Sequence, residues 1–237
     1  MGSLSTQNQL LQTLDPADLA FLKPYFEDVF LPLQHVLENP NKPIENAYFL
    51  EGGIASIVAN LEGKQIEVGI IGREGMVGHI LSQGVDHSPF ETFMQGEATA
   101  KKISAADLRI AFQKRPAIQQ HFLYYARAFS IQISYTALTN AVALLQERMA
   151  RWLLMTQDRM GTSSVSLTHQ FLSLMLGVRR SGVTDAIHQL EGAGLIKGTR
   201  GCIEIRDRKG LEKLAGDHYG PSEREFKELL GYFPGQS

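Results

Sequence analysis

Two neighbouring arginines, Arg179 and Arg180, stand where their side chains could recognise DNA bases. After them, Val183, Ile187 and Leu190 recur at helical spacing, so one face of a helix can be buried. The polar residues gather at the start of the opposite face: Arg179, Arg180, Ser181, Thr184 and Asp185. An exposed polar N-terminal end is what a DNA recognition helix inserts into the major groove. The segment therefore predicts sequence-specific DNA binding.

A shorter helix precedes this segment and a hairpin follows it. Thr168 is an N-cap residue, and the apolar residues after it recur at helical spacing. Gly177 ends that helix, which completes a helix-turn-helix pattern over residues 167–196. Residues 195–197 and 202–206 flank a turn that starts and ends with glycine, and they are predicted to form two strands. The module is therefore a winged helix-turn-helix.

Residues near the start of the shorter helix could contact the DNA backbone. The candidates are Thr168, His169 and Gln170, together with Arg179. Contacts with phosphates would add affinity without selecting a base sequence. An ordinary solvated surface is the alternative for all four residues.

Charge is unevenly distributed along the chain. The 237 residues are 43% apolar and carry a net charge of -2, as in an ordinary soluble protein with room for more than one core. Residues 141–210 contain ten Lys and Arg against six Asp and Glu, whereas residues 1–140 contain ten against fourteen. Chance could produce this asymmetry, but it also fits a DNA-binding domain attached to one that does not bind DNA.

Composition excludes several kinds of site. Cys202 is the single cysteine, so the chain can form no intrachain disulfide and cannot supply the cysteine ligands of an iron–sulfur cluster. Cys202 is expected to be a small buried side chain, with a thiol switch on the wing as the alternative. The seven histidines lack zinc-like spacing. No apolar run approaches the roughly 20 residues that span a bilayer, so we expect a cytoplasmic protein with no metal and no membrane partner.

Short β-rich runs separated by glycine occupy the first half of the chain. The alternation at residues 66–70 puts three aliphatic side chains on one face of a strand, and Glu67 and Gly69 on the other. A Glu-Gly turn at residues 62–63 joins this strand to the preceding one, and further strands are expected from about residue 90 to 103. Because no long helix is interleaved, we expect an antiparallel β-roll and an α+β fold.

One long helix is predicted from Pro116 to about Val142, because Pro116 suits a first turn and neither Pro nor Gly follows before residue 158. One stripe on it comprises Ile118, Phe122, Tyr125, Phe129, Gln132 and Thr136. A second stripe comprises Leu123, Ala126, Ser130, Ile133 and Ala137. One stripe could pack on the roll and the other on a symmetry mate, which favours a homodimer. The alternative is a single core helix buried on both sides.

These pieces resemble the CRP/FNR family of bacterial transcription regulators, which includes the cyclic-AMP receptor protein and FNR. The resemblance covers roughly residues 14–210, and its most specific part is residues 167–196. The segment YFLEGGIASIVANLEGKQIEV, from Tyr48, is similar to the family's roll hairpin. The segment AVALLQERMARWLL, from Ala141, is similar to the hinge.

The resemblance implies a cyclic-nucleotide-binding-like β-roll, a long dimerisation helix and a winged helix-turn-helix. Together with it, the residue patterns predict four segments: a sensor roll at residues 1–115, a dimerisation helix and hinge at 116–143, a DNA-binding domain at 144–220 and, from the tail's own pattern, a tail helix at 221–237. The implied partners are double-stranded DNA, a second copy of the chain and, as a further candidate, RNA polymerase.

The recognition helix keeps part of the family's pattern. Arg180 falls where members place an arginine on a guanine, a contact worth about 1–3 kcal/mol of discrimination. Ser181 stands where many members have a glutamate, and Asp185 where the cyclic-AMP receptor protein has a second arginine. The operator sequence should therefore differ from the usual one. Asp185 could accept a hydrogen bond from a cytosine amino group, or it could orient a neighbouring arginine.

The sensor half departs further from the family. Members that bind cyclic nucleotides hold the ribose with a Gly-Glu pair, the phosphate with an Arg-Ser pair and the adenine with a Thr-Ser pair. Here the first pair is Gly-His, the second falls near Ser88-Pro89 and the third is Ile-Ser. Without the arginine a phosphate would be uncompensated, so we expect an unknown small-molecule effector other than cyclic AMP. The effector pocket is predicted from Gly78, His79, Ser88, Ile133 and Ser134.

Several interpretations of the roll stay open: another small molecule, a prosthetic group or a scaffold for dimerisation alone. Carbon-monoxide-sensing relatives bind haem through a histidine near the position of His79, so haem is one alternative to an ordinary hydrogen-bonded histidine. A roll that acts through protein partners is the alternative to a DNA-binding regulator. An enzyme is not expected, because His79 and His87 lack a convincing set of catalytic partners. In the tail, residues 222–225 predict a capping box ahead of a short amphipathic helix.

Overall fold

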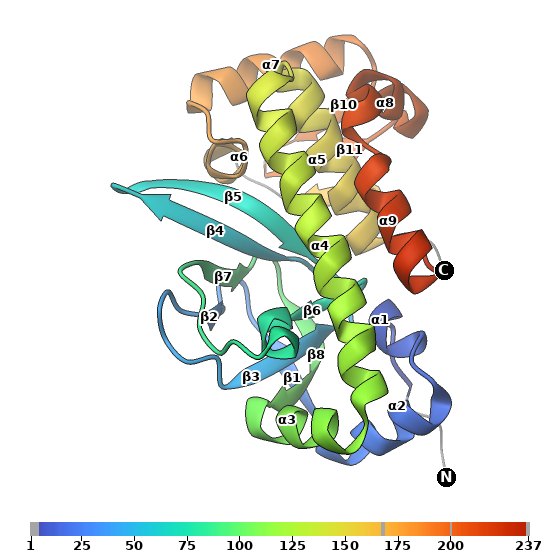
Figure 1. Cartoon of the computed structure of the whole chain (residues 1–237). Helices are drawn as coiled ribbons and strands as arrows, with labels where there is room; N and C mark the ends of the chain where they lie inside the picture. Colours follow the sequence, from blue (N-terminus) through green and yellow to red (C-terminus); the bar gives the residue numbers. More distant parts are fainter. Residues whose placement is uncertain (1–4, 167–168, 200, 236–237) are drawn as a thin grey trace.

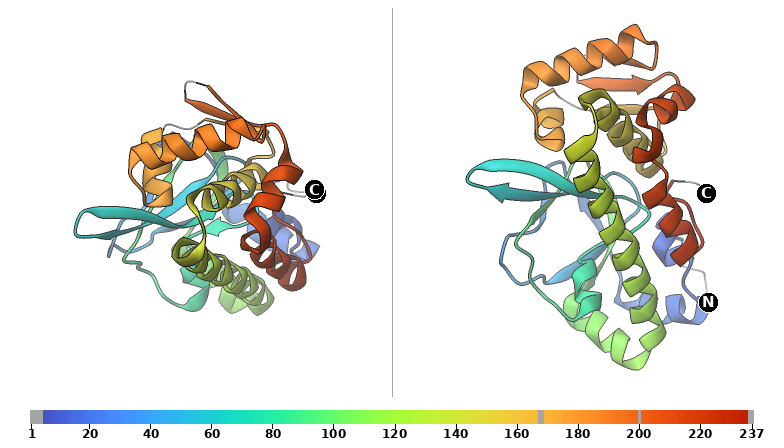
Figure 2. Two further views of the ribbon diagram at one scale, coloured as in Figure 1. Left: turned by 90° about the horizontal axis from the view of Figure 1, so that it is seen from above. Right: turned by 45° about the horizontal axis from the view of Figure 1, so that its top comes forward.

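The computed structural model describes residues 5–166, 169–199 and 201–235. An N-terminal β-roll lies at one end of the molecule and a winged helix domain at the other, and the long helix α4 runs between them (Figure 1). Two further views show that the chain's last helix returns from the winged helix domain toward the roll (Figure 2). The predicted α+β architecture is confirmed.

Two four-stranded antiparallel sheets form the roll. The first has the order β1 (Glu27–Leu31), β8 (Ala98–Ser104), β3 (Asn46–Leu50) and β6 (Met76–Val77). The second has the order β2 (Val36–Glu38), β7 (Glu91–Met94), β4 (Ala55–Leu61) and β5 (Lys64–Ile71). The predicted hairpin joins β4 to β5, and a bulge lies between Ile57 and Val58. Strands β1 and β2 were not predicted, because β1 is largely exposed and β2 has only three residues.

Short helices close the ends of the roll. They are α1 (Gln9–Gln12), α2 (Pro16–Leu22), η1 (Lys23–Tyr25), η2 (His79–Gln83) and α3 (Ala105–Lys114). The Asp15 carboxylate accepts a hydrogen bond from the Ala17 N–H at 2.8 Å and so caps α2. The Ser104 hydroxyl accepts from the Asp107 N–H at 3.0 Å and caps α3. These side chains satisfy donors that a helix N-terminus otherwise leaves unpaired.

Helix α4 (Pro116–Val142) lies across the roll at two glycines. A Cβ atom at Gly69 would lie 2.7 Å from a ring carbon of Phe129, and one at Gly75 would lie 2.1 Å from the hydroxyl oxygen of Tyr125. Phe122 adds a ring contact to Phe49 of β3, with centroids 5.4 Å apart. Only glycine lets the helix approach the sheet this closely, so these two positions fix where α4 crosses the roll.

The first stripe on α4 faces the chain's own roll. Phe122, Tyr125, Phe129 and Gln132 are buried within the subunit, and Thr136 is half-buried. In the second stripe Ser130 and Ala137 are exposed, Leu123 and Ile133 are half-buried and Ala126 is buried. The pairing of this stripe with a symmetry mate stays a prediction, and a further face of the helix points more directly outward. That face comprises Gln120, Tyr124, Arg127, Ile131, Tyr135, Leu138 and Val142, and we call it the outer face of α4.

The long helix stops without a proline or glycine. Ala143 and Leu144 adopt extended ψ angles of 149° and 156°, and α5 (Leu145–Met160) begins after them. The Leu144 N–H donates to the Glu147 carboxylate at 2.8 Å, which caps the new helix. A local hydrogen bond thus marks the boundary between the two helices, where a proline or glycine would be expected from the sequence.

The C-terminal domain is a winged helix-turn-helix, as predicted. It contains α6 (His169–Leu176), α7 (Arg180–Gly192) and α8 (Arg208–Ala215), with a sheet in the order β10 (Ile196–Thr199), β11 (Cys202–Ile205) and β9 (Ser164–Ser166). The predicted wing hairpin extends through Gly198 and Thr199, and β9 is a third strand that was not predicted. A separate hydrophobic core, which includes Met149, Leu153 and Leu172, holds these elements together.

The tail packs back onto the body of the molecule. After η3 (Gly216–His218), helix α9 (Pro221–Leu230) lies alongside α4 (Figure 1). Its Phe226 and Leu230, with Tyr232, join the core of the roll rather than that of the winged helix domain. The predicted capping box is wrong: the Gly220 N–H donates to Glu223 at 2.8 Å, and the predicted N-cap Ser222 lies buried inside the first turn.

A buried ion pair connects the two cores. The Arg159 Nε of α5 lies 2.8 Å from a carboxylate oxygen of Glu74 in the β5–β6 turn, and both side chains are fully buried. The other Glu74 oxygen accepts from the Gly72 N–H at 2.9 Å. The Tyr232 hydroxyl donates to the Glu74 carbonyl at 2.5 Å. Roll, winged helix domain and tail therefore meet at one residue, Glu74.

Replacing one partner of this pair should cost more stability than replacing both. In the Arg159→Met variant the Glu74 carboxylate stays buried without a counter-charge, and we expect unfolding free energy to fall by about 3–5 kcal/mol. The Glu74→Gln/Arg159→Met double variant removes both charges and should lose less. Urea unfolding followed by the fluorescence of Trp152, the single tryptophan, measures both. A double variant no more stable than the single one would contradict this role.

Candidate nucleic-acid interface and effector pocket

The N-terminal end of α7 presents a polar surface to solvent. Arg179, Arg180, Ser181 and Asp185 are exposed, and no salt bridge to either arginine forms among the described residues. Thr184 is half-buried, and its hydroxyl donates to the Arg180 carbonyl at 3.2 Å. The predicted base-reading residues therefore share one accessible surface at the start of one helix. Guanidinium groups in such a position can form bidentate hydrogen bonds with an acceptor pair.

Apolar residues hold this helix in place from its other side. Val183, Ala186, Ile187 and Leu190 are buried in the core of the winged helix domain. The Glu191 carboxylate accepts from the Gly198 N–H at 2.7 Å, which ties the end of α7 to the wing. Cys202 is a free, half-buried thiol on β11. Of the predicted phosphate contacts, Thr168 and the side chains of His169 and Gln170 lie outside the described residues.

The roll contains a cavity of about 240 Å³ between the sheet, the η2–β7 loop and α4. Its lining residues are Glu38, Ile57, His79, Ile80, Gln83, Val85, His87, Ser88, Pro89, Phe90, Phe129 and Ile133. Three of the five predicted effector residues, His79, Ser88 and Ile133, are thus brought together. Gly78 does not line the cavity, and Ser134 points its hydroxyl at the Ser130 carbonyl, 2.9 Å away. We call this cavity the roll pocket.

The polar groups of the roll pocket are acidic or neutral. Burial raises the pKa of the Glu38 carboxyl, whose partners are the Thr92 hydroxyl and the Gly78 N–H. Burial lowers the pKa of His79 to about 4, so its imidazole is uncharged at neutral pH. The ring of His79 packs edge-on against Phe129, with centroids 4.8 Å apart. No lysine or arginine is among the lining residues.

Neither haem nor a metal is supported as a resident group by the described residues. Pockets for drug-sized ligands measure about 300–1,000 Å³, and haem is larger than most such ligands, so it does not fit the roll pocket as it stands. The part of the chain that the structure describes has no cluster of three or more His, Cys, Asp or Glu side chains that could hold a metal ion.

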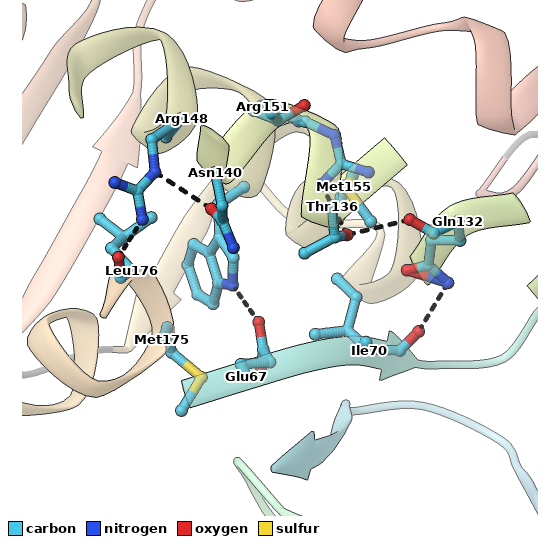
Figure 3. Close-up of a pocket in the computed structure, with 13 residues that line it drawn as sticks. Glu67, Ile70, Gln132, Thr136, Asn140, Arg148, Arg151, Met155, Met175 and Leu176 are labelled. Atoms are coloured by element: carbon cyan, nitrogen blue, oxygen red, sulfur yellow. Dashed lines mark hydrogen bonds between the residues drawn. The ribbon is translucent and has the colours of Figure 1, made fainter. Parts of the chain in front are cut away.

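A hydrogen-bonded cluster joins the roll hairpin to α5 (Figure 3). The Trp152 indole N–H donates to one Glu67 oxygen at 2.7 Å, and the Ser56 hydroxyl donates to the other at 2.7 Å. The Gln95 amide also donates to Glu67, at 2.6 Å. Burial raises the pKa of Glu67 to about 7, and no cation among the described residues is hydrogen-bonded to it. This carboxyl therefore titrates near neutral pH.

Sequence reasoning missed this cluster. The alternation on β5 places Glu67 opposite the aliphatic face, which normally means exposure to solvent. In the structure both faces of β5 are covered there, because α5 packs on the second one, and Glu67 is only 4% exposed. The one available signal was that Trp152, which buries a polar N–H, needs an acceptor.

Two arginines of α5 reach across the end of α4 (Figure 3). Arg148 donates to the Asn140 side chain at 3.1 Å and to the Leu176 carbonyl at the end of α6. Arg151 donates to the Thr136 hydroxyl at 3.2 Å and to the His218 carbonyl at 2.8 Å. The end of α4 is thus linked by hydrogen bonds to the helix-turn-helix and to the start of the tail.

The turn of the helix-turn-helix rests on the roll hairpin. A Cβ atom at Gly177, whose φ is +61°, would lie 2.7 Å from the Ile66 side chain of β5. Phe171 of α6 packs edge-on against Phe93 of β7, with ring centroids 6.4 Å apart. The β-roll therefore contacts the helix-turn-helix directly as well as through α5.

The outer face of α4 leaves large apolar side chains in solvent. Tyr124 is 43% exposed, Leu138 52% and Val142 65%, and Leu144 in the following link is 60% exposed. Arg127 is the charged member of the face. Contiguous apolar surface of this kind on a helix is typical of a protein–protein contact.

Comparison with known proteins identifies the C-terminal domain. Residues 147–214 match the model of the Crp-like helix-turn-helix domain. No match is found among curated proteins by sequence. None of the helices in the described ranges is long and apolar enough to cross a membrane.

Solved structures of regulators share the fold over most of their length. FixK2 from Bradyrhizobium japonicum is 16% identical with a TM-score of 0.70, over 81% of this chain and 98% of that chain. The CRP-family transcriptional regulator TTHB099 from Thermus thermophilus is 17% identical with a TM-score of 0.67, over 79% and 96%. The c-di-GMP-responsive regulator CLP from Xanthomonas campestris is 16% identical with a TM-score of 0.67, over 81% and 100%.

The Glu67 cluster predicts a pH-dependent stability. Because the folded pKa of about 7 lies above the ordinary value of 4.5, the unfolded state loses this proton first, so stability falls as pH rises from about 4.5 to about 7 and levels off above that. The loss should be at most about 3 kcal/mol. Glu67→Gln should flatten the fall between pH 5 and 8 in urea unfolding, whereas Glu62→Gln, at an exposed residue of the hairpin turn, should not. Parallel curves for wild type and Glu67→Gln would refute this prediction.

Proposed function

We propose that this chain, which belongs to the CRP/FNR family of transcription regulators, acts as a homodimer that reads a palindromic DNA site with α7. It is a DNA-binding regulator and not an enzyme. The observation that carries the proposal is the exposed Arg180 at the start of the helix that a Crp-like domain uses for DNA. Such a regulator acts where the DNA is, in the bacterial cytoplasm.

The outer face of α4 supports the dimer. Pairing two copies through Leu138, Val142 and their neighbours would cover apolar surface that one subunit leaves exposed. A two-fold axis along this helix would also set the two α7 helices at a fixed separation. Readers of this class meet half-sites about 34 Å apart on successive turns of the major groove.

The roll pocket is our candidate effector site. Its position against α4, through Phe129 and Ile133, lets a bound molecule act on the helix that carries the outer face. Cyclic AMP is not the proposed effector, because the lining residues include no cation for its phosphate. Of the relatives, CLP is described as responsive to c-di-GMP, so effectors vary within this fold.

Removing Arg180 should weaken and relax DNA recognition. Selection from random duplexes should give wild type a palindromic site. Arg180→Ala should bind that site with a loss of about 1–3 kcal/mol, or roughly 5- to 150-fold, and should tolerate more bases at one position of each half-site. Arg224→Ala, at an exposed arginine of α9, is the control and should behave as wild type. An Arg180→Ala protein with unchanged affinity and unchanged site would contradict the assignment.

A charge on the outer face of α4 should separate the subunits. Leu138→Glu should convert a dimer to a monomer in size-exclusion chromatography with light scattering, because a carboxylate would be buried without a partner. The matched control is Leu61→Glu, at the 76% exposed end of β4, which should stay dimeric. The dimer proposal fails if wild type is monomeric at working concentration, or if Leu138→Glu remains a dimer.

A further inference from the structure

The roll pocket has the size and walls of a site for a compact, mostly apolar molecule. An apolar cavity of about 150 Å³ already accommodates benzene, and this one measures about 240 Å³. Ile57 and Phe129 form buried walls, and Ile133 of α4 adds a half-buried one. One or two rings would therefore fill it without rearranging the roll.

The entrance to the pocket is apolar too. Val85 is 43% exposed and Phe90 is 37% exposed, and both line the cavity. A bound molecule with apolar edges would cover these two side chains. The removal of such surface from water is the main driving force available to a site with so few polar groups.

The charges in the pocket select against anions. Glu38 is 6% exposed, and its hydrogen bonds come from the Thr92 hydroxyl and the Gly78 N–H, with no cation paired to it among the described residues. His87 lies at the solvent side of the pocket, and its Nδ1 atom is 3.1 Å from a carboxylate oxygen of Asp86. Pro89 has no N–H to offer, and the Ser88 hydroxyl, which accepts from the Phe90 N–H at 3.2 Å, is a neutral donor that carries no positive charge. An anion would thus meet a carboxylate and little that compensates it.

One polar atom of a residue that lines the pocket lacks a partner. The Nδ1 atom of His79 is enclosed, and no described residue forms a hydrogen bond with it. A molecule in the pocket therefore meets the uncharged imidazole ring of His79 as part of the wall and does not reach this atom. The ring itself is fixed by its edge-on contacts with Phe129 and Tyr125.

We infer that the roll pocket binds an uncharged or cationic, largely apolar small molecule, and that it rejects phosphates and carboxylates of the same size. Glu38 is the residue that sets this charge preference, and the ring of His79 forms part of the wall. The inference rests on the proposed function, in which the roll pocket is the effector site, and it adds the chemical class of the effector.

A matched set of probes tests the charge preference. Indole, tryptamine and indole-3-acetate share one ring system and differ in charge, and cyclic AMP is the fourth probe. Binding to the full-length protein is measured by isothermal titration calorimetry up to millimolar concentration. Indole and tryptamine should bind saturably, with tryptamine the tighter, and the two anions should bind at least tenfold more weakly. Tighter binding of either anion, or no saturable binding of any probe, would overturn the inference.

Variants place the binding in the roll pocket. Glu38→Gln keeps the shape of the side chain and should remove the advantage of tryptamine over indole. Ile133→Trp should fill the cavity and abolish binding of both. The control Ile110→Trp makes the same change at a 40% exposed residue of α3 outside the pocket, and it should bind as wild type. Probe binding that survives Ile133→Trp in a folded protein, judged by circular dichroism, would refute the location.

DNA selection on the same preparations separates this inference from the proposed function. Protein that selects a palindromic site but binds none of the probes leaves the regulator intact and refutes the ligand class. Protein that binds indole and tryptamine but selects no DNA sequence supports the ligand class and refutes the regulator.

Discussion

The ion pair between Glu74 and Arg159 joins the two halves of the molecule in an interior that water does not reach. A buried charge without its partner is strongly unfavourable, so the β5–β6 turn and the end of α5 cannot separate gradually. The carbonyl of the same glutamate accepts from Tyr232 of the tail. Within one subunit, therefore, the roll and the start of the winged helix domain behave as one body.

Between α4 and α5 the regular helical backbone stops at the extended link of Ala143 and Leu144. Around it, Arg148 and Arg151 hold the end of α4 through hydrogen bonds with side chains and carbonyls that are partly exposed. From Ile133 at the roll pocket to Leu176 at the helix-turn-helix there is a continuous series of contacts along α4 and across to α5. These contacts are a route by which a change in the packing of α4 could affect the helix-turn-helix.

Much of the architecture could be predicted from periodicity alone, because each predicted element has a strong local pattern. The two helices of the DNA-reading motif, the β4–β5 hairpin and α4 are cases in point. The failures at Glu67 and on α4 share one cause, which is packing between elements far apart in the sequence. The alternation on β5 places Glu67 on a face that would be exposed to solvent, but α5 covers that face in the structure. The outer face of α4 could be identified only from the structure, which shows which side of the helix packs on the roll.

The candidate sites divide in the same way. Arg180 and its neighbours lie together because they share one helix turn, which sequence spacing can determine. The walls of the roll pocket come from β2, β4, η2, the η2–β7 loop and α4. The sequence near Glu38 and Ile57 therefore gave no sign that these residues line a pocket. A family pattern could indicate the neighbourhood of His79 but not the charge of the surface around it.

The position of Phe226, Leu230 and Tyr232 in the first domain's core has a consequence for how the chain is made. Domains usually fold as units in the order in which the ribosome releases them. Here the N-terminal roll stays incomplete until residues 226–232 leave the ribosome exit tunnel, because Phe226, Leu230 and Tyr232 supply part of its interior. A product that ends before residue 226 would therefore expose apolar surface on the roll, the domain synthesised first, and so become a substrate for chaperones and proteases.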